Sequence, residues 1–154
     1  MYQIVNCRDY AGGLEEAVKY VHRQWGSERN YAFYYDAISH SPPVAGAIPQ
    51  FYLLLDQDKI IGCYGLIIND FVSRHDLTPW LCSVYIDPAY RGKRLMNLYF
   101  EHAKTELAVT NYPAMYLVTD HEGLYEKFGW TRIEDGYDLN GDATRIYMMP
   151  LDRP

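Results

Sequence analysis

The sequence is short of cysteine, of positive charge and of long hydrophobic runs, and each shortage excludes a class of protein. Its three cysteines form no Cys-x-x-Cys pair, which argues against a zinc or disulfide framework and fits a reducing cytoplasm. No apolar run reaches the roughly 18 residues that a membrane-spanning helix needs, and the N-terminus shows no secretory signal. The net charge of −6 disfavours nucleic acid as a partner. We therefore expect a cytoplasmic protein that binds neither membranes nor nucleic acid.

The sequence does contain enough apolar material for one folded domain. It has 154 residues, of which 49% are hydrophobic and 22% charged. We therefore expect one domain over residues 1–154 with a substantial core. Tyrosine is frequent, with 16 residues. Most of these rings are expected to pack in the core or on the surface, and the alternative is a pocket lined by amphipathic rings.

Hydrophobic periodicity predicts a mixed α/β (α+β) domain around one central sheet. Strands are expected at residues 2–5, 51–55, 59–68, 80–86, 115–119, 130–139 and 144–149. Helices are expected at residues 14–25, 28–38, 92–108 and 122–128. Ser27 is the expected N-cap of the second helix, and Gly129 ends the last one. The predicted order is βααβββαβαββ.

Positive charge is concentrated after the fourth predicted strand. The strand stops at Asp87, and Arg91, Lys93 and Arg94 follow where the next helix is expected to begin. Free N–H groups and the helix dipole make this end of a helix attractive to anions and unfavourable for cations. The charges therefore favour an anion-binding site, and a solvated basic turn is the alternative.

Two segments resemble signatures of one enzyme superfamily. Residues 86–93, Ile-Asp-Pro-Ala-Tyr-Arg-Gly-Lys, resemble the acetyl-CoA motif of the GNAT N-acetyltransferases, whose pattern is Gln/Arg-x-x-Gly-x-Gly/Ala after the fourth strand. Residues 125–130, Tyr-Glu-Lys-Phe-Gly-Trp, resemble a second signature of that superfamily, Tyr-x-Lys-x-Gly-Phe. The two occur in the right order, and the predicted element order matches the GNAT fold over essentially the whole chain.

The resemblance implies a fold and a reaction. The fold is a mixed, mostly antiparallel sheet that splays between its fourth and fifth strands. The reaction is direct, acetyl-CoA-dependent transfer of an acetyl group to a primary amine of a small molecule or a protein. Such a transfer needs neither a metal nor a nucleophilic serine or cysteine. The resemblance leaves a homodimer open.

The resemblance also implies which residues bind the donor. The pantetheine arm would lie along the free backbone edge of Val84, Tyr85 and Ile86, whose N–H groups can polarise the thioester carbonyl. The pyrophosphate would lie on backbone N–H groups of the following turn, which comprises Arg91, Gly92, Lys93, Arg94, Leu95 and Met96.

This turn departs from the superfamily pattern, because Arg94 and Met96 stand where glycine or alanine is usual. We expect Arg94 to lie already in the first helical turn, where its N–H faces the ligand and its guanidinium is within reach of a phosphate. If these residues are not helical, the cofactor site is impaired.

The resemblance identifies Tyr125 as the acid that protonates the departing thiolate, and packing of the helix on the sheet is the alternative. The general base is open. The glutamate usual near the start of the fourth strand is missing, and Asp76 is the nearest carboxylate, with Asp70 and His121 as alternatives and a water chain as a further one.

Tyr34, Trp80 and His121 are expected to contact the acceptor, since aromatic and acidic surroundings suit a cationic amine. Two other functions remain open. One is a catalytically degenerate module that binds CoA or acyl-CoA without turnover. The other is a protein-interaction module that binds no cofactor.

Overall fold

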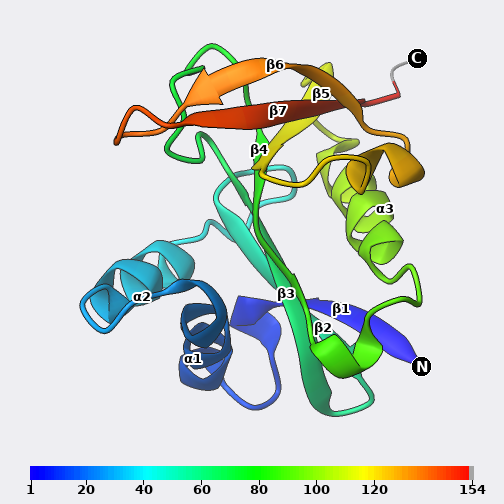
Figure 1. Cartoon of the computed structure of the whole chain (residues 1–154). Coiled ribbons are helices and arrows are strands. Elements are labelled where there is room, and N and C mark those ends of the chain that lie inside the picture. The colour runs from blue at the N-terminus through cyan, green and yellow to red at the C-terminus, as the bar shows by residue number, and fades with distance from the viewer. Residues whose placement is uncertain (153–154) are drawn as a thin grey trace.

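A computed structural model describes residues 1–152 of the chain (Figure 1). The strands are β1 (Tyr2–Asn6), β2 (Gln50–Asp56), β3 (Lys59–Ile67), β4 (Trp80–Ile86), β5 (Ala114–Thr119), β6 (Thr131–Tyr137) and β7 (Ala143–Pro150). The α-helices are α1 (Leu14–Trp25), α2 (Tyr31–Ser39) and α3 (Met96–Leu107). Three short 3-10 helices are η1 (Cys7–Asp9), η2 (Pro88–Tyr90) and η3 (Tyr125–Phe128). None of the helices in the described range is long and apolar enough to cross a membrane.

The strands form one seven-stranded sheet in the order β1-β2-β3-β4-β5-β7-β6. Every neighbouring pair is antiparallel except β4 and β5, which are parallel. These two strands share a single register pair, Trp80 opposite Tyr116. Beyond that pair they diverge, and Figure 1 shows β5, β6 and β7 standing apart from the lower ends of β3 and β4. The predicted mixed sheet, splayed between its fourth and fifth strands, is confirmed.

A β-bulge bends β4 close to the splay. Cys63 pairs with Tyr85 and Gly65 pairs with Cys82, so two residues of β4, Ser83 and Val84, lie opposite one residue of β3. Ser83 has a φ of +54°, in the left-handed region. A bulge of this kind bends its strand and interrupts the regular pairing. The β4 edge beyond it is therefore turned toward the gap rather than toward β5.

Hydrophobic packing covers both faces of the sheet. On one face, α1 and α2 bury a cluster that contains all three cysteines, each of them a free thiol. On the other face, α3 packs through Tyr99, Phe100, Ala103 and Leu107, a three- and four-residue spacing that gives one apolar stripe. A third cluster around Trp80 and Tyr116 closes the sheet where β4 meets β5.

Two helices begin later than the sequence predicts. α2 begins at Tyr31, not at Glu28, because the Ser27 N–H donates to Asn30 Oδ1 (2.6 Å) and the intervening residues form a separate turn. Ser27 is therefore not the N-cap; that position belongs to Asn30.

α3 begins at Met96 rather than near Gly92. Gly92 and Arg94 adopt positive φ values, which an α-helix does not contain. The predicted helix over 122–128 is reduced to η3, and Gly129 ends it at φ +92° as expected.

Candidate active site

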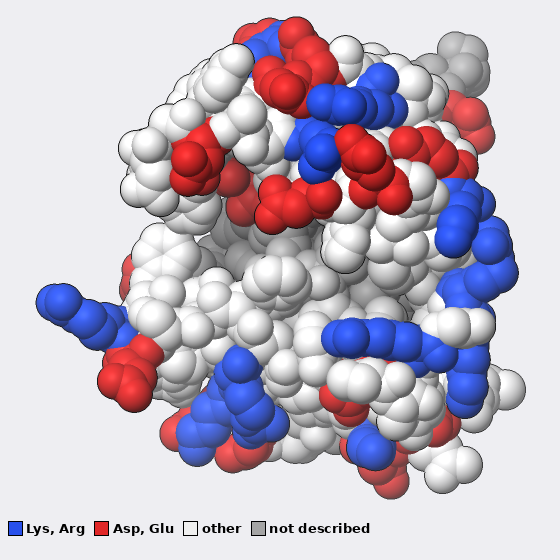
Figure 2. Space-filling model, viewed as in Figure 1, with Lys and Arg blue, Asp and Glu red and all other residues white. Residues whose placement is uncertain are grey.

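Three adjoining cavities open around β4, and Figure 2 shows the molecule hollowed between the part that carries β5–β7 and the part that carries α1 and α2. The α3-side cavity, of about 440 Å³, is lined by Val84–Ile86, by the turn before α3 and by η3. The central cavity, of about 510 Å³, is lined by residues 81–84 of β4, residues 117–121 and the loop at residues 70–71. The apolar cavity, of about 330 Å³, is walled by α2, the Ile48-Pro49 segment and the end of β3.

The cavities share residues where they meet. Val84, His121 and Tyr125 line both the α3-side and the central cavity. Five residues line both the central and the apolar cavity: Tyr34, Asp70, Phe71, Cys82 and Ser83. A molecule in the α3-side cavity can therefore meet a second molecule in the central cavity at Val84 and Tyr125.

The turn before α3 is a backbone cradle for an anion. Gly92 (φ +83°) and Arg94 (φ +58°) are left-handed, and Leu95 is right-handed helical. Within residues 1–152, the backbone N–H groups of Gly92 through Met96 donate to no protein acceptor. Successive residues that alternate between left-handed and right-handed backbone conformations, and whose N–H groups are free, form an anion-binding concavity just before a helix N-terminus.

Basic side chains surround this cradle, and Figure 2 shows Lys and Arg gathered on the side of the molecule where α3 begins. Arg91 fastens the turn to β4, since its Nε donates to the Ile86 carbonyl (2.8 Å) and its guanidinium lies 5.4 Å from the Tyr85 ring centroid. Lys93 lies outside the cavity lining, with its Nζ 5.2 Å from the centroid of the Tyr90 ring.

Arg94 differs from the expectation. It is left-handed and precedes α3 instead of lying in its first turn, which is the conformation for which the superfamily pattern has glycine. Its guanidinium packs 4.7 Å from the Phe128 ring centroid and donates to the Lys127 carbonyl (3.2 Å). The side chain is therefore folded onto η3, and the cradle remains open.

Tyr125 lies at the junction of the α3-side and central cavities. Its ring is buried beside Phe100, Trp130 and Tyr147, and burial raises the pKa of its phenol to about 12. Its hydroxyl donates to no acceptor in the described part of the chain. A phenol with this pKa keeps its proton at neutral pH, so Tyr125 is held in the protonated form that an acid needs.

Asp70 is the carboxylate that lines both the central and the apolar cavity, while Asp120 lines only the central one. The Asn69 side chain brackets the loop, since its Nδ2 donates to the Val72 carbonyl (2.9 Å) and its Oδ1 accepts from the Val72 N–H (3.2 Å). Phe71 is left-handed (φ +56°). Burial raises the pKa of Asp70 to about 6. No hydrogen bond or ion pair holds this carboxylate among residues 1–152, and an unpaired, perturbed carboxylate in a cavity is typical of a functional site.

The structure does not bring Asp76 or Trp80 into any of the three cavities. Asp76 is exposed and accepts two hydrogen bonds from Arg74 (2.9 and 2.8 Å), which hold the pKa of its carboxyl below the usual range and make it a weaker base. Trp80 is fully buried, and its indole N–H donates to the Leu77 carbonyl (2.6 Å). Tyr34 and His121 do line the cavities.

Cys82 lines the central and apolar cavities, but its thiol is no nucleophile. Burial raises the pKa of this thiol well above its usual value, with the nearby Asp70 carboxylate as a further cause. The thiolate is the reactive form of cysteine, so a protonated Cys82 contributes only to the cavity wall.

Comparison with known proteins identifies the family. The sequence matches the acetyltransferase (GNAT) family over residues 8–130, and the chain belongs to this family. No curated protein matches the chain by sequence. An aminoglycoside 6'-N-acetyltransferase complexed with coenzyme A has 15% sequence identity and a TM-score of 0.70, with 99% of each chain covered.

Two further solved structures show the same fold. The ribosomal-protein-S18-alanine N-acetyltransferase from Escherichia coli has 14% identity and a TM-score of 0.66, with 100% of this chain and 96% of that chain covered. The spermidine/spermine N-acetyltransferase SpeG from Vibrio cholerae has 16% identity and a TM-score of 0.65, with 97% and 92% covered.

Members of this family use acetyl-CoA, and the residues present here fit that molecule. The free N–H groups of the cradle and the cations around it suit a pyrophosphate. The β4 edge at Val84–Ile86 has no strand partner on the β5 side, so it offers hydrogen bonds to an extended amide-containing arm.

The left-handed turn gives a test on CoA affinity. Gly92→Val puts a β-branched residue at φ +83°, so we expect CoA to bind at least about tenfold more weakly. Arg94→Gly suits its backbone conformation and leaves the cradle intact, so we expect its Kd for CoA to stay within about threefold of wild type. Isothermal titration calorimetry measures both. A change of more than about tenfold for Arg94→Gly, in either direction, would contradict the open cradle.

Proposed function

We propose that this protein is an acetyl-CoA-dependent N-acetyltransferase that transfers the acetyl group directly to a primary amine. One observation carries the proposal. A cavity with a backbone anion cradle opens, at Tyr125, into a second cavity that holds the unpaired Asp70 carboxylate. This arrangement separates a donor side from an acceptor side. Tyr125 can protonate the thiolate that leaves on the donor side, and Asp70 can take a proton from the amine on the acceptor side.

On the donor side, the N–H groups from Gly92 to Met96 bind the pyrophosphate, and the free edge of β4 binds the pantetheine arm. Bound acetyl-CoA supplies an acetyl thioester. Backbone N–H groups at the bulged end of β4, around Val84, polarise the carbonyl of that thioester and stabilise negative charge that develops on its oxygen.

On the acceptor side, Asp70 removes the proton that the amine must lose. A primary amine with a pKa of about 10.4 is mostly protonated at neutral pH. The raised pKa of Asp70, about 6, makes it a stronger base than an ordinary carboxylate while leaving it ionised at pH 7. As the N–C bond forms and the C–S bond breaks, the nitrogen loses its second proton to solvent water and Tyr125 gives its proton to the departing thiolate, which leaves as the thiol of CoA. Tyr125 then regains a proton from solvent. We further propose that the reaction takes place in the cytoplasm, where acetyl-CoA is available.

Thiol release from acetyl-CoA in the presence of primary amines tests the reaction, and a melting curve with and without CoA tests donor binding separately. Ligand at about a hundred times its Kd stabilises the protein by about 2.7 kcal/mol. Absence of both thiol release and a melting shift would refute the proposal. CoA binding without transfer to any amine would favour the degenerate module.

Tyr125→Phe tests the acid in the same assay. It keeps the buried ring and removes only the hydroxyl, so we expect kcat to fall about ten- to thousandfold with CoA affinity nearly unchanged. Tyr137→Phe, at an exposed position of β6, is the matched control and should retain wild-type kcat. Full activity in Tyr125→Phe would reassign this residue to packing.

Asp70→Asn tests the base through two pH profiles. In wild type, kcat/KM should rise with pH and level off above about pH 6 as Asp70 ionises; in Asp70→Asn that limb should vanish and the rate fall about 10²- to 10⁴-fold. The stability of the wild-type fold should change with pH in the opposite direction to kcat/KM. Because the folded-state pKa lies above the usual 3.8, wild type loses stability as pH rises from about 4 to 6.

The asparagine side chain of Asp70→Asn does not ionise, so this variant does not lose stability as the pH rises. Asp70→Asn should therefore be more stable than wild type at pH 8, by about 1–3 kcal/mol after allowance for partial exposure, and equal to it below about pH 4. Urea unfolding at the two pH values measures the difference. An active Asp70→Asn, or one no more stable than wild type at pH 8, would show that Asp70 is not the buried base.

A further inference from the structure

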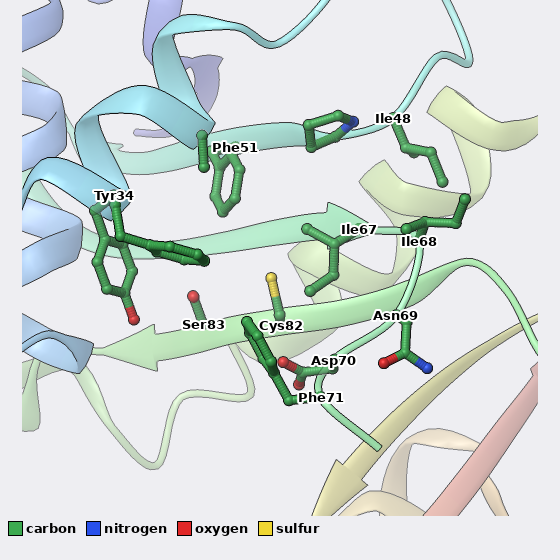
Figure 3. A pocket seen from close by; sticks show the side chains of 13 residues that line it. Tyr34, Ile48, Phe51, Ile67, Ile68, Asn69, Asp70, Phe71, Cys82 and Ser83 are labelled. Carbon is green, nitrogen blue, oxygen red and sulfur yellow. The ribbon is translucent and has the colours of Figure 1, made fainter. Parts of the chain in front are cut away.

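The apolar cavity is larger than an amino group needs in order to lose its proton to Asp70. It extends from Asp70 and Cys82 away from Tyr125, over about 330 Å³, between α2 and the sheet. Figure 3 shows Tyr34, Phe51 and Ile67 around this space, with the Asp70 carboxylate projecting toward β4 near Cys82. A side group attached to a molecule held at Asp70 has room to extend into this cavity.

The rim of this cavity carries exposed apolar side chains. Phe33 is 55% exposed, Phe71 is 57% exposed and Ile68 is 69% exposed. The Phe33 and Phe71 rings lie 6.1 Å apart between centroids, so α2 and the Asp70 loop meet through them. Adjacent exposed apolar side chains around a cavity mark a binding site for an apolar ligand.

Asp70 is the one charged side chain among the residues that line the apolar cavity. Tyr34 from α2 and Cys82 from β4 face it, and the only other carboxylate on the adjoining central cavity is Asp120. Three acids near the Asp70 loop and the β6–β7 strands are paired with arginines: Asp76 and Glu134 with Arg74, and Glu122 with Arg145. The apolar cavity itself therefore offers one site for one cation.

We propose that the acceptor is a small primary amine with a single apolar group, an aromatic ring or a branched aliphatic chain. This inference rests on the proposed function. The ammonium group binds at Asp70, facing Tyr125 across the central cavity, and the apolar group fills the space between Phe33, Ala37 and Phe51.

Acceptors with several cations fit this surface poorly. Each further ammonium group that a polyamine or aminoglycoside places in the apolar cavity would lie against apolar side chains, because Asp70 is the one carboxylate that lines it. Leaving a charge unpaired in an apolar pocket is unfavourable. The spermidine/spermine and aminoglycoside acetyltransferases share the fold of this protein, but the apolar cavity favours a different acceptor.

Direct binding tests this inference without relying on turnover. Calorimetry with CoA present would compare 2-phenylethylamine with spermidine and kanamycin. We expect 2-phenylethylamine to bind at least about tenfold more tightly, since burial of its ring adds favourable free energy that the polycations lack.

Ala37→Phe fills the cavity from α2 and should weaken 2-phenylethylamine binding at least about tenfold. Ala32→Phe makes the same change at an exposed position of α2 and should leave it unchanged. Melting temperature and CoA affinity of each variant report whether it folds.

Tighter binding of spermidine or kanamycin would overturn this inference, and so would equal binding of 2-phenylethylamine to Ala37→Phe and wild type. Either result leaves the acetyltransferase proposal standing if any amine is acetylated. Conversely, the absence of transfer to all amines, with 2-phenylethylamine still bound in the apolar cavity, would refute the reaction and leave the cavity as a binding site for an apolar amine.

Discussion

β4 and β5 pair at one position only, Trp80 opposite Tyr116, and the functional surface of the protein depends on that limited contact. Because the strands diverge, the β4 edge at Val84–Ile86 has no strand partner on the β5 side, and the three cavities adjoin β4 between Leu81 and Ile86. The bulge at Ser83, in the middle of β4, and the buried cluster around Trp80, at its start, hold this geometry. If β4 and β5 paired along their full length, no space would remain between them for the acetyl donor.

Two features of the Asp70 loop, on the acceptor side of the site, lower the stability of the fold but serve the proposed reaction. Asp70 is an ionisable group without a partner, and the adjacent Phe71 is left-handed with its ring exposed. Both features are unfavourable for folding, and the Asn69 side chain restrains the loop that contains them. The Arg74–Asp76 pair close by shows the opposite arrangement, a carboxylate satisfied by a guanidinium and therefore weak as a base.

Local sequence patterns predicted the element order and the basic turn, and a signature identified Tyr125 as a candidate acid. Each of these depends on contiguous residues: the hydrophobic period, the turn residues and the signature itself. These patterns did not predict the left-handed backbone conformation of Arg94, since arginine forms helices readily and non-glycine residues seldom adopt a positive φ. Asp76 and Trp80 were expected at the site because they lie near the start of β4 in sequence. Only the fold reveals that Arg74 neutralises Asp76, that the core encloses Trp80, and that the loop aims Asp70 inward.

Hydrogen–deuterium exchange with and without CoA measures most directly whether the splayed strand and the turn before α3 form the donor site. If they do, the amides of Gly92–Met96 will exchange at least about tenfold more slowly with CoA bound, because they gain acceptors that the protein alone does not provide. Within Val84–Ile86, the amides that face the gap beside β5 rather than β3 will gain similar protection. CoA binding that leaves both segments unprotected, or that protects a different surface, would contradict this assignment.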